Sequence, residues 1–412
     1  MKLNQMKKIF ADTAYVRTGG TEEELRCANY LLERCKDLGL NAWLEDFEVD
    51  MATISEATLT VDGKSIPCKG YFNAGSHQLE APIYYLAGTD RYSLAGCKDK
   101  IVLLDGYLGF WKYQDLLDNG ALGFITYSGD PNQTNNDIDQ RELRAMVCEG
   151  KKKLPGVNIN VKDAIAIIDK EAKTASITLT QKEYKGKSHN VVAEIPGRED
   201  KWVVLSAHYD STSLSQGAYD NMSGSVGLLG IAEALRGKNL RCGIRLLFCG
   251  SEERGLLGSK AYVSAHAEEL DKIELNVNLD MIGCITGKFI ACCSTEEKLC
   301  SYIEYLGYEK GFPVATRQDV YSSDSTPFAD KGVPALSFAR ISAPGTAPIH
   351  CRFDTRKVMK MEHMQQDIDF IAAFTERMAN AVTCPVHREI PQSVKDKLDT
   401  YMARKRPAEG HR

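Results

Sequence analysis

Four short apolar runs in the second half of the chain are each followed by side chains that bind metal ions or move protons. The runs lie at 202–207, 244–249, 275–279 and 335–338, and the polar side chains that follow them are His208 and Asp210, Glu252 and Glu253, Asp280, and, after a loop, His350. In open α/β sheets, ligands collect at the carboxyl ends of the strands. We therefore expect these side chains to share one cleft.

Taken singly, each residue is weak evidence, because a histidine after a strand is often structural and a pair of glutamates is often solvated surface. The combination is more specific. Several strands would bring five or six carboxylates to one edge of a sheet, and like charges that close together cannot all ionise. A bound cation would remove this repulsion, so the pattern indicates a metal site.

The spacing of the first group suggests roles for its members. His208 and Asp210 are two residues apart at a strand end, so their side chains point the same way in extended backbone. Asp210 can then accept from the imidazole nitrogen that does not face the metal, which makes His208 a ligand and Asp210 its orienting partner. Asp220 follows in a loop just before a predicted helix, and we assign it as the bridge between two ions.

The adjacent residues Glu252 and Glu253 have diverging side chains. One can bind metal while the other stands over the bound water as a proton acceptor. Metal-assisted hydrolysis needs this division of labour.

The elements that must position these residues are indicated by periodicity. Thr21 and Glu24 form a capping-box pattern that begins an amphipathic helix ending near Gly39. From about 45 to 184 the chain shows short β-like runs broken by Gly, Asp and Asn, including 100–105 and, after a short helix near 113–117, 120–127. After Lys185 the runs are longer and more apolar, with a helix at 224–235, as in buried strands of a mostly parallel sheet.

These patterns predict an α/β fold: a mixed, mostly parallel central sheet flanked by helices, with a smaller β-rich α/β domain inserted. The expected division is a catalytic domain in two parts, 1–45 and 185–384, an inserted domain at 46–184 and a charged C-terminal tail at 385–412; the joining of 1–45 to 185–384 is implied by the family resemblance given below. A final amphipathic helix at 361–382 ends the catalytic core. The tail is expected to be solvated and frayed.

Composition excludes several classes of partner. The 51 Lys and Arg residues are balanced by 56 Asp and Glu, for a net charge of −5, so nothing favours nucleic acid or an anionic membrane surface. Neither a signal-peptide core nor a run of about 18 apolar residues is present.

The 13 Cys lack the spacing of a disulfide framework, and the adjacent Cys292 and Cys293 fit buried apolar thiols. We expect a cytoplasmic protein; its oligomeric state is not indicated.

Taken together, these residues resemble the M28 family of zinc peptidases, the bacterial leucyl aminopeptidase-like enzymes. The stretches that carry the resemblance are Ser206–Ser211, Gly217–Gly224, Cys249–Ser259, Asn278–Gly283 and Ile349–His350. It covers the N-terminal helix and most of 187–382. The inserted module, about 46–184, is more loosely similar to the protease-associated (PA) domain of some relatives, which would shade the cleft and restrict substrate size.

The resemblance implies two zinc ions and peptide substrates. The counterparts of His208 and Asp280 hold one zinc in that family, those of Glu253 and His350 hold the other, and that of Asp220 bridges them. The Glu252 counterpart activates the shared water, which attacks the amide carbonyl, and carries a proton to the leaving nitrogen. The implied activity is removal of N-terminal residues from peptides.

One departure from the family pattern affects specificity. Relatives often have Ser-Asp-His before the last ligand, whereas this chain has Ser323, Asp324 and Ser325, so a histidine is missing on the substrate side. Tyr321, just upstream, is either an oxyanion-stabilising hydroxyl or a packing residue. We expect the substrate preference to differ from that of relatives with the histidine.

Three alternatives remain. An M20-type carboxypeptidase or deacylase uses a similar order of ligands, but its extra domain normally lies between the acidic ligand and the final histidine, whereas here the insertion precedes His208. A glutaminyl-cyclase-like transferase would keep one zinc on the same scaffold. A non-catalytic binding protein would not require Glu252, because a structural metal site needs no general base.

Overall fold

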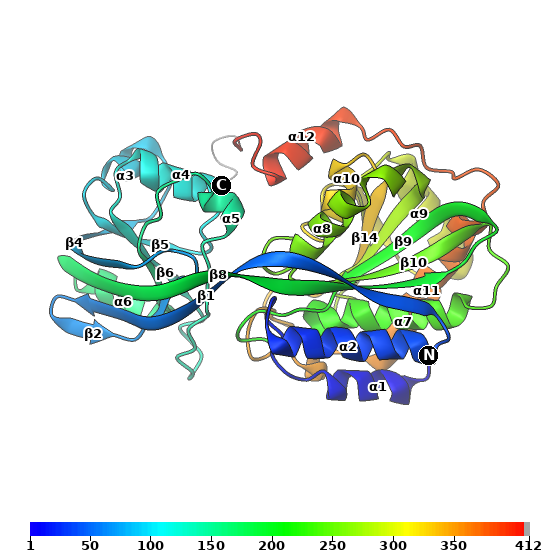
Figure 1. The fold of residues 1–412 in the computed structure, drawn as a ribbon, viewed down its shortest axis with the longest axis horizontal. Coiled ribbons are helices and arrows are strands. Elements are labelled where there is room, and N and C mark those ends of the chain that lie inside the picture. Colours follow the sequence, from blue (N-terminus) through cyan, green and yellow to red (C-terminus); the bar gives the residue numbers. More distant parts are fainter. Residues whose placement is uncertain (408–412) are drawn as a thin grey trace. The chain divides into compact units, whose positions relative to one another are not determined.

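The computed structural model describes residues 1–407 as two compact units. The first comprises Met1–Val49 and Lys187–Met402, and the second comprises Asp50–Gly186 with the described residues from Ala403 on. The division falls inside two long strands, β1 (Asn41–Val61) and β8 (Thr174–Ile195), which run through both units (Figure 1). The sequence-based limits at 45/46 and 184/185 lie within a few residues of these points. That these two limits are domain boundaries stays a prediction.

The first unit is built on a central, mostly parallel sheet. Its strand order is β13-β12-β14-β11-β9-β10-β8. The pairs β9–β10, β9–β11, β11–β14 and β12–β13 are parallel, and β8–β10 and β12–β14 are antiparallel. The further strands are β9 (Glu199–His208), β10 (Cys242–Cys249), β11 (Ile273–Leu279), β12 (Lys288–Cys293), β13 (Ala315–Gln318) and β14 (Ala335–Ile341).

Helices cover both faces of this sheet (Figure 1). One face packs against α1 (Leu3–Asp12), α2 (Glu22–Asp37), α7 (Ser223–Leu235), α9 (Lys298–Lys310) and α11 (Met361–Asn380). The other packs against α8 (Leu257–Ala265), α10 (Ser325–Asp330) and α12 (Gln392–Tyr401). The short helical turns are η1 (Ala218–Met222), η2 (Ala267–Lys272) and η3 (Arg356–Val358). The predicted α/β class is confirmed.

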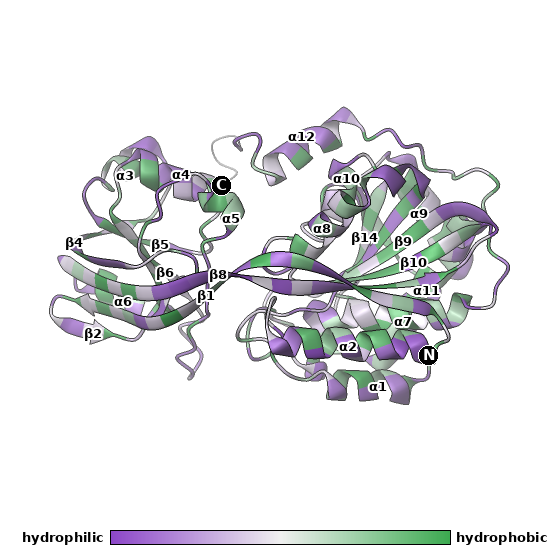
Figure 2. Cartoon of the chain, in the orientation of Figure 1, coloured by the Kyte–Doolittle hydropathy of each residue, from purple (hydrophilic) through white to green (hydrophobic). Residues whose placement is uncertain are grey.

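The central strands are apolar on both faces, as their uninterrupted hydrophobic runs predict. In β10, Ile244, Leu246 and Phe248 face the α7 side, while Leu247 and Cys249 face the α8 side. Figure 2 shows green, hydrophobic residues along these strands. Such burial on two sides fixes the strand register, because a slip by one residue would exchange the two faces.

The second unit is a smaller α/β sheet. Strands β4 (His77–Leu86), β5 (Ile101–Asp105), β6 (Gly123–Ser128) and β7 (Gly156–Asn160) pair in parallel, β8 and β3 (Lys69–Gly70) flank them antiparallel, and β2 (Lys64–Ile66) pairs with β1. Its helices are α3 (Arg91–Ala95), α4 (Phe110–Asp118), α5 (Ala145–Cys148) and α6 (Val161–Asp169). Apolar clusters lie on both faces of this sheet.

The structure corrects the prediction at three places. A helix, α1, precedes the one expected to be first, and it buries Met6, Ile9 and Phe10. The predicted frayed tail is wrong at Gln392–Tyr401, which form α12 and bury Val394 and Leu398 against the sheet. Apolar residues at helical spacing outweigh the surrounding charges there; residues 408–412 of the tail lie outside the described part.

The third correction concerns the expected capping box of α2. Thr21 does cap the helix by accepting from the Glu24 amide at 3.3 Å. The Glu24 carboxylate, however, accepts from the Gly20 amide and from more distant partners instead of closing the box.

Across residues 1–407, every helix is too short or too polar to pass through a lipid bilayer.

Candidate metal centre

The chemistry-bearing residues lie at the carboxyl edge of the central sheet. Strands β9 and β10 are parallel and in register, so that His208 at the end of β9 is paired with Cys249 at the end of β10. The loop after Cys249 carries Glu252 and Glu253 to the same edge. Asp280 follows β11 directly, and its amide donates to the carbonyl of Phe338 on the neighbouring strand β14.

The five predicted ligands form two groups that share one carboxylate. His208, Asp220 and Asp280 make the first, and Asp220, Glu253 and His350 make the second, with the potential ligand atoms of each group within 4.8 Å of one another. Nε2 of His208 lies 3.2 Å from Oδ1 of Asp220, and Nε2 of His350 lies 3.0 Å from Oδ2. The two oxygens of Asp220 thus face different imidazoles. That these residues bind metal stays a prediction.

Asp210 links the histidine to the glutamate loop. Its Oδ1 lies 3.3 Å from Nδ1 of His208, an ion-pair contact, and accepts from the Glu252 amide at 3.0 Å. Its Oδ2 accepts from the Glu253 amide at 3.1 Å. Asp210 is completely buried. One carboxylate therefore orients the imidazole and fixes the backbone of both glutamates.

Asp220 is held by a residue that the sequence analysis did not single out. Asp354 accepts from the amides of Tyr219 and Asp220, at 2.7 and 3.1 Å, and from the hydroxyl of Ser215 at 3.2 Å. Asp354 lies four residues after His350, in the same loop. The sequence signal that could have revealed this role is the closeness of Asp354 to the proposed ligand His350. A buried carboxylate needs hydrogen-bond donors, and the amides of a buried loop need an acceptor.

Arg17 holds the other end of the loop that leads to Asp220. Its side chain is completely buried, and its guanidinium donates to the carbonyls of Tyr209, Gln216 and Gly217 at 2.8, 2.6 and 3.1 Å. Its backbone pairs with Ser211 in both directions. From the sequence alone, a single arginine before a helix is expected to be exposed on the surface. Its structural role becomes visible only in the fold.

The electrostatics of the cluster are those of crowded, buried carboxylates. Burial raises the pKa of Glu252 above its usual range, and the charge of Glu253 adds to this. Burial and then the charge of Asp220 raise the pKa of Glu253 to about 7. Burial opposes protonation of His350, but Glu253 and Asp220 outweigh it and raise the pKa of His350 to about 12. These buried carboxylates can therefore all be ionised only if positive charge lies close to them.

Bound zinc would supply this positive charge. The donor set of two imidazoles and three carboxylates is one that zinc prefers in proteins. Oδ1 of Asp280 is buried and accepts no hydrogen bond from any residue of 1–407, so this candidate ligand atom has no hydrogen-bond donor, although Nε2 of His208 lies 3.7 Å away. The His350 side chain is 35 % exposed, whereas those of the other four candidate ligands are at most 11 % exposed. The cluster therefore opens to solvent beside His350.

The segment that lacks the family histidine is folded into the core. Ser325 is buried, and its hydroxyl lies 2.8 Å from that of Ser337 on β14. Asp324 is also buried and accepts from Ser259 at 2.5 Å. Burial, followed by the charges of Asp280 and Asp220, raises the pKa of Tyr321. Its role as an oxyanion donor stays a prediction.

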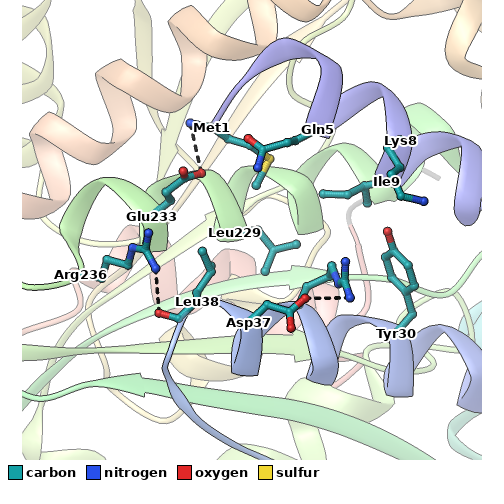
Figure 3. A pocket seen from close by; sticks show the side chains of 11 residues that line it. Met1, Gln5, Lys8, Ile9, Tyr30, Asp37, Leu38, Leu229, Glu233 and Arg236 are labelled. Carbon is teal, nitrogen blue, oxygen red and sulfur yellow. Dashed lines mark hydrogen bonds and ion pairs between the residues drawn. The ribbon is translucent and has the colours of Figure 1, made fainter.

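A separate cavity of about 270 Å³ lies between α1, α2 and α7 (Figure 3). Its charged groups are paired: Arg34 contacts Asp37 at 2.8 Å, Lys8 contacts Asp12 at 2.9 Å, and Arg236 donates to the carbonyl of Leu38 at 3.1 Å. It lies away from the carboxyl edge of the sheet. We assign no chemistry to it.

Similarity to known proteins extends along most of the chain. It is 28% identical over 376 residues to aminopeptidase YwaD of Bacillus subtilis, covering 87% of this chain and 80% of that protein. It is 32% identical over 257 residues to leucine aminopeptidase 2 of Trichophyton rubrum, covering 58% of this chain. The match spans 51% of the fungal protein, about half its length.

The fold is also that of a solved structure described as BSAP, a zinc aminopeptidase from Bacillus subtilis. The TM-score is 0.78 at 23% identity, and 95% of this chain and 99% of that one are covered. The relatives and the family match together place this chain among the hydrolases, in the class of peptidases. Residues 190–375 match the sequence model of peptidase family M28, so this part of the chain is an M28 peptidase domain. The matched range contains the five candidate ligands together with Asp210, Glu252 and Asp354, whereas Arg17 lies before it.

Proposed function

We propose that the chain is an aminopeptidase that hydrolyses the first peptide bond of its substrates at a two-zinc site. The observation that carries the proposal is the arrangement of two ligand groups that share Asp220, with Glu252 beside them. His208 and Asp280 would hold one ion, Glu253 and His350 the other, and Asp220 both. The names of the relatives, an aminopeptidase and a leucine aminopeptidase, support the same activity.

Zinc ions held there would supply Lewis acidity, which polarises a substrate carbonyl and makes a water molecule more acidic. The chain's own residues would do the rest. The carboxylate cluster, which opens to solvent beside His350, would attract the positively charged α-amino end of a peptide. Asp210 keeps His208 oriented, and Asp354 keeps Asp220 in place.

Glu252 is the proposed general base. Its Oε2 lies 3.8 Å from Nε2 of His208, so its carboxylate stands next to the first ligand group without belonging to it. It would take a proton from the attacking water and give it to the leaving nitrogen as the C–N bond breaks. Burial raises its pKa above the usual range for a carboxyl group, which makes it a stronger base.

The variant Glu252→Gln tests this role. Glutamine keeps the size of the side chain but cannot accept the proton, so we expect kcat to fall by about 10²–10⁴-fold while zinc content and melting temperature stay unchanged. The control is Glu268→Gln, which alters an exposed glutamate of η2 and should leave kcat unaffected. Near wild-type turnover in Glu252→Gln would show that the base is another group.

A further inference from the structure

Glu24, on the helix α2, is buried directly behind the loop that carries the proposed general base. Its side chain is inaccessible to solvent and receives four hydrogen bonds. Oε1 accepts from the amide and the hydroxyl of Ser251, at 2.8 and 3.1 Å, and from the hydroxyl of Ser188 at 2.9 Å. Oε2 accepts from the amide of Gly20 at 2.6 Å. These bonds join the start of α2 to the residue before Glu252.

Helix capping does not account for this burial. Thr21 already caps α2, and the exposed Glu22 and Glu23 already place negative charge in its first turn. Burying a third carboxylate is costly unless it is satisfied by hydrogen bonds. Burial, followed by the charge of Asp210, raises the pKa of Glu24 to about 8, which reflects that cost. Three of its four hydrogen bonds come from Ser251 and Ser188, which lie far from the helix in sequence.

The backbone that Glu24 holds is in an unusual conformation. Ser251 has a φ of +53°, in the left-handed region, which costs a residue other than glycine about 1–2 kcal/mol. This conformation turns the next two amides, of Glu252 and Glu253, toward Asp210. The loop is therefore clamped between two buried carboxylates, with Glu24 on one side and Asp210 on the other.

Two glycines allow the close approach. A Cβ atom at Gly250 would lie 2.5 Å from the carbonyl oxygen of His189 and 3.0 Å from Oε1 of Glu24. A Cβ atom at Gly19 would lie 2.3 Å from the hydroxyl of Ser251. Both glycines thus let the backbone pack closely against Ser251 and the Glu24 carboxylate, which leaves the loop little freedom while that contact is intact.

We propose that Glu24 is a positioning residue for catalysis: through Ser251 it holds the loop so that Glu252 stays in reach of the attacking water. The proposal rests on the proposed function of Glu252. Glu24 itself touches neither substrate nor the reacting atoms. A displacement of about 1 Å at a catalytic group can lower the rate by roughly 10²-fold, so loosening this loop has a measurable effect.

The test compares Glu24→Gln with Glu23→Gln, an exposed change in the same helical turn. Both oxygens of Glu24 face backbone amides, which only donate, so the glutamine amide group must lose one of these bonds in either orientation. We expect kcat to fall by about 10–100-fold with KM and zinc content nearly unchanged. We also expect faster hydrogen exchange of amides 250–253 in the metal-free protein. Glu23→Gln should match the wild type in all four measurements.

A variant that leaves α2 intact guards against misfolding of Glu24→Gln. Ser188→Ala removes one hydrogen-bond donor to Glu24. It should also speed hydrogen exchange of amides 250–253 and lower kcat, each by a smaller factor than Glu24→Gln does. Unchanged exchange and kcat in both variants would overturn the proposal, as would a loss of zinc that accounts for all lost activity. If the wild type does not hydrolyse peptides, the proposed function fails, while the exchange experiment still decides whether Glu24 holds the loop.

Discussion

Asp210 illustrates how much of the site depends on residues that would not touch substrate. It contacts Nδ1 of His208 and accepts from the amides of Glu252 and Glu253. A residue with three such contacts fixes the imidazole tautomer, the direction of one ligand and the backbone of the base. Its position two residues after His208 made the first of these roles predictable. The contact with the glutamate loop depends on the pairing of β9 with β10.

Asp210→Asn is expected to weaken zinc binding by about 10–100-fold while leaving the protein folded. The asparagine amide group would face either a backbone N–H or the imidazole, so one of the contacts is lost. Affinity is measured by competition with a chelator of known strength. Asp271→Asn, at a side chain that is 98% exposed, is the control. Equal zinc affinity in the two variants would contradict the orienting role.

The residues with a direct chemical signal were predictable, whereas among the residues that support them only Asp210 was. His208, Asp220, Glu252, Glu253, Asp280 and His350 stand after apolar runs or in recognisable stretches, and the structure brings them together. Arg17, Glu24 and Asp354 act through backbone groups far along the chain. A sequence shows which residues can donate or accept, but their partners are set only when the sheet assembles.

At the scale of elements, uninterrupted apolar runs predicted the buried strands β9, β10, β11 and β14, because both faces of a central strand are covered. The long strands β1 and β8 were not foreseen, since parts of them are exposed and carry many charges. Helix α12 was missed for a related reason. Its two buried side chains, Val394 and Leu398, stand among charged neighbours that dominate the composition.

The docking of α12 gives a prediction at this scale. Leu398 is 2% exposed in the cluster that contains Phe328 and Val333, so Leu398→Ala should weaken docking by roughly 2–5 kcal/mol. The readout is hydrogen exchange of amides 392–401, which should become faster. The matched change Ser393→Ala, at an exposed position of α12, should have no effect. The prediction would fail if amides 392–401 of the wild type already exchanged hydrogen as fast as those of a free peptide. That result would show that the helix is not docked.

At the scale of the whole molecule, the site belongs to one unit. Every residue assigned to it lies in Met1–Val49 or Lys187–Met402, and the M28 match at 190–375 falls inside that unit. The second unit has its own sheet and apolar clusters. Its likeness to a protease-associated domain, and the cytoplasmic location, stay predictions. The residues proposed to carry the chemistry therefore all belong to the first unit.

The measurement that tests the central claim most directly is zinc bound per chain, determined together with hydrolysis of a panel of aminoacyl amides before and after chelation. We expect about two zinc ions, release of the N-terminal residue that chelation abolishes, and recovery when zinc is restored. Hydrolysis that continues at full rate in the metal-free protein would contradict the account. One zinc with cyclisation of N-terminal glutamine would instead identify a transferase, and bound zinc without turnover a binding protein.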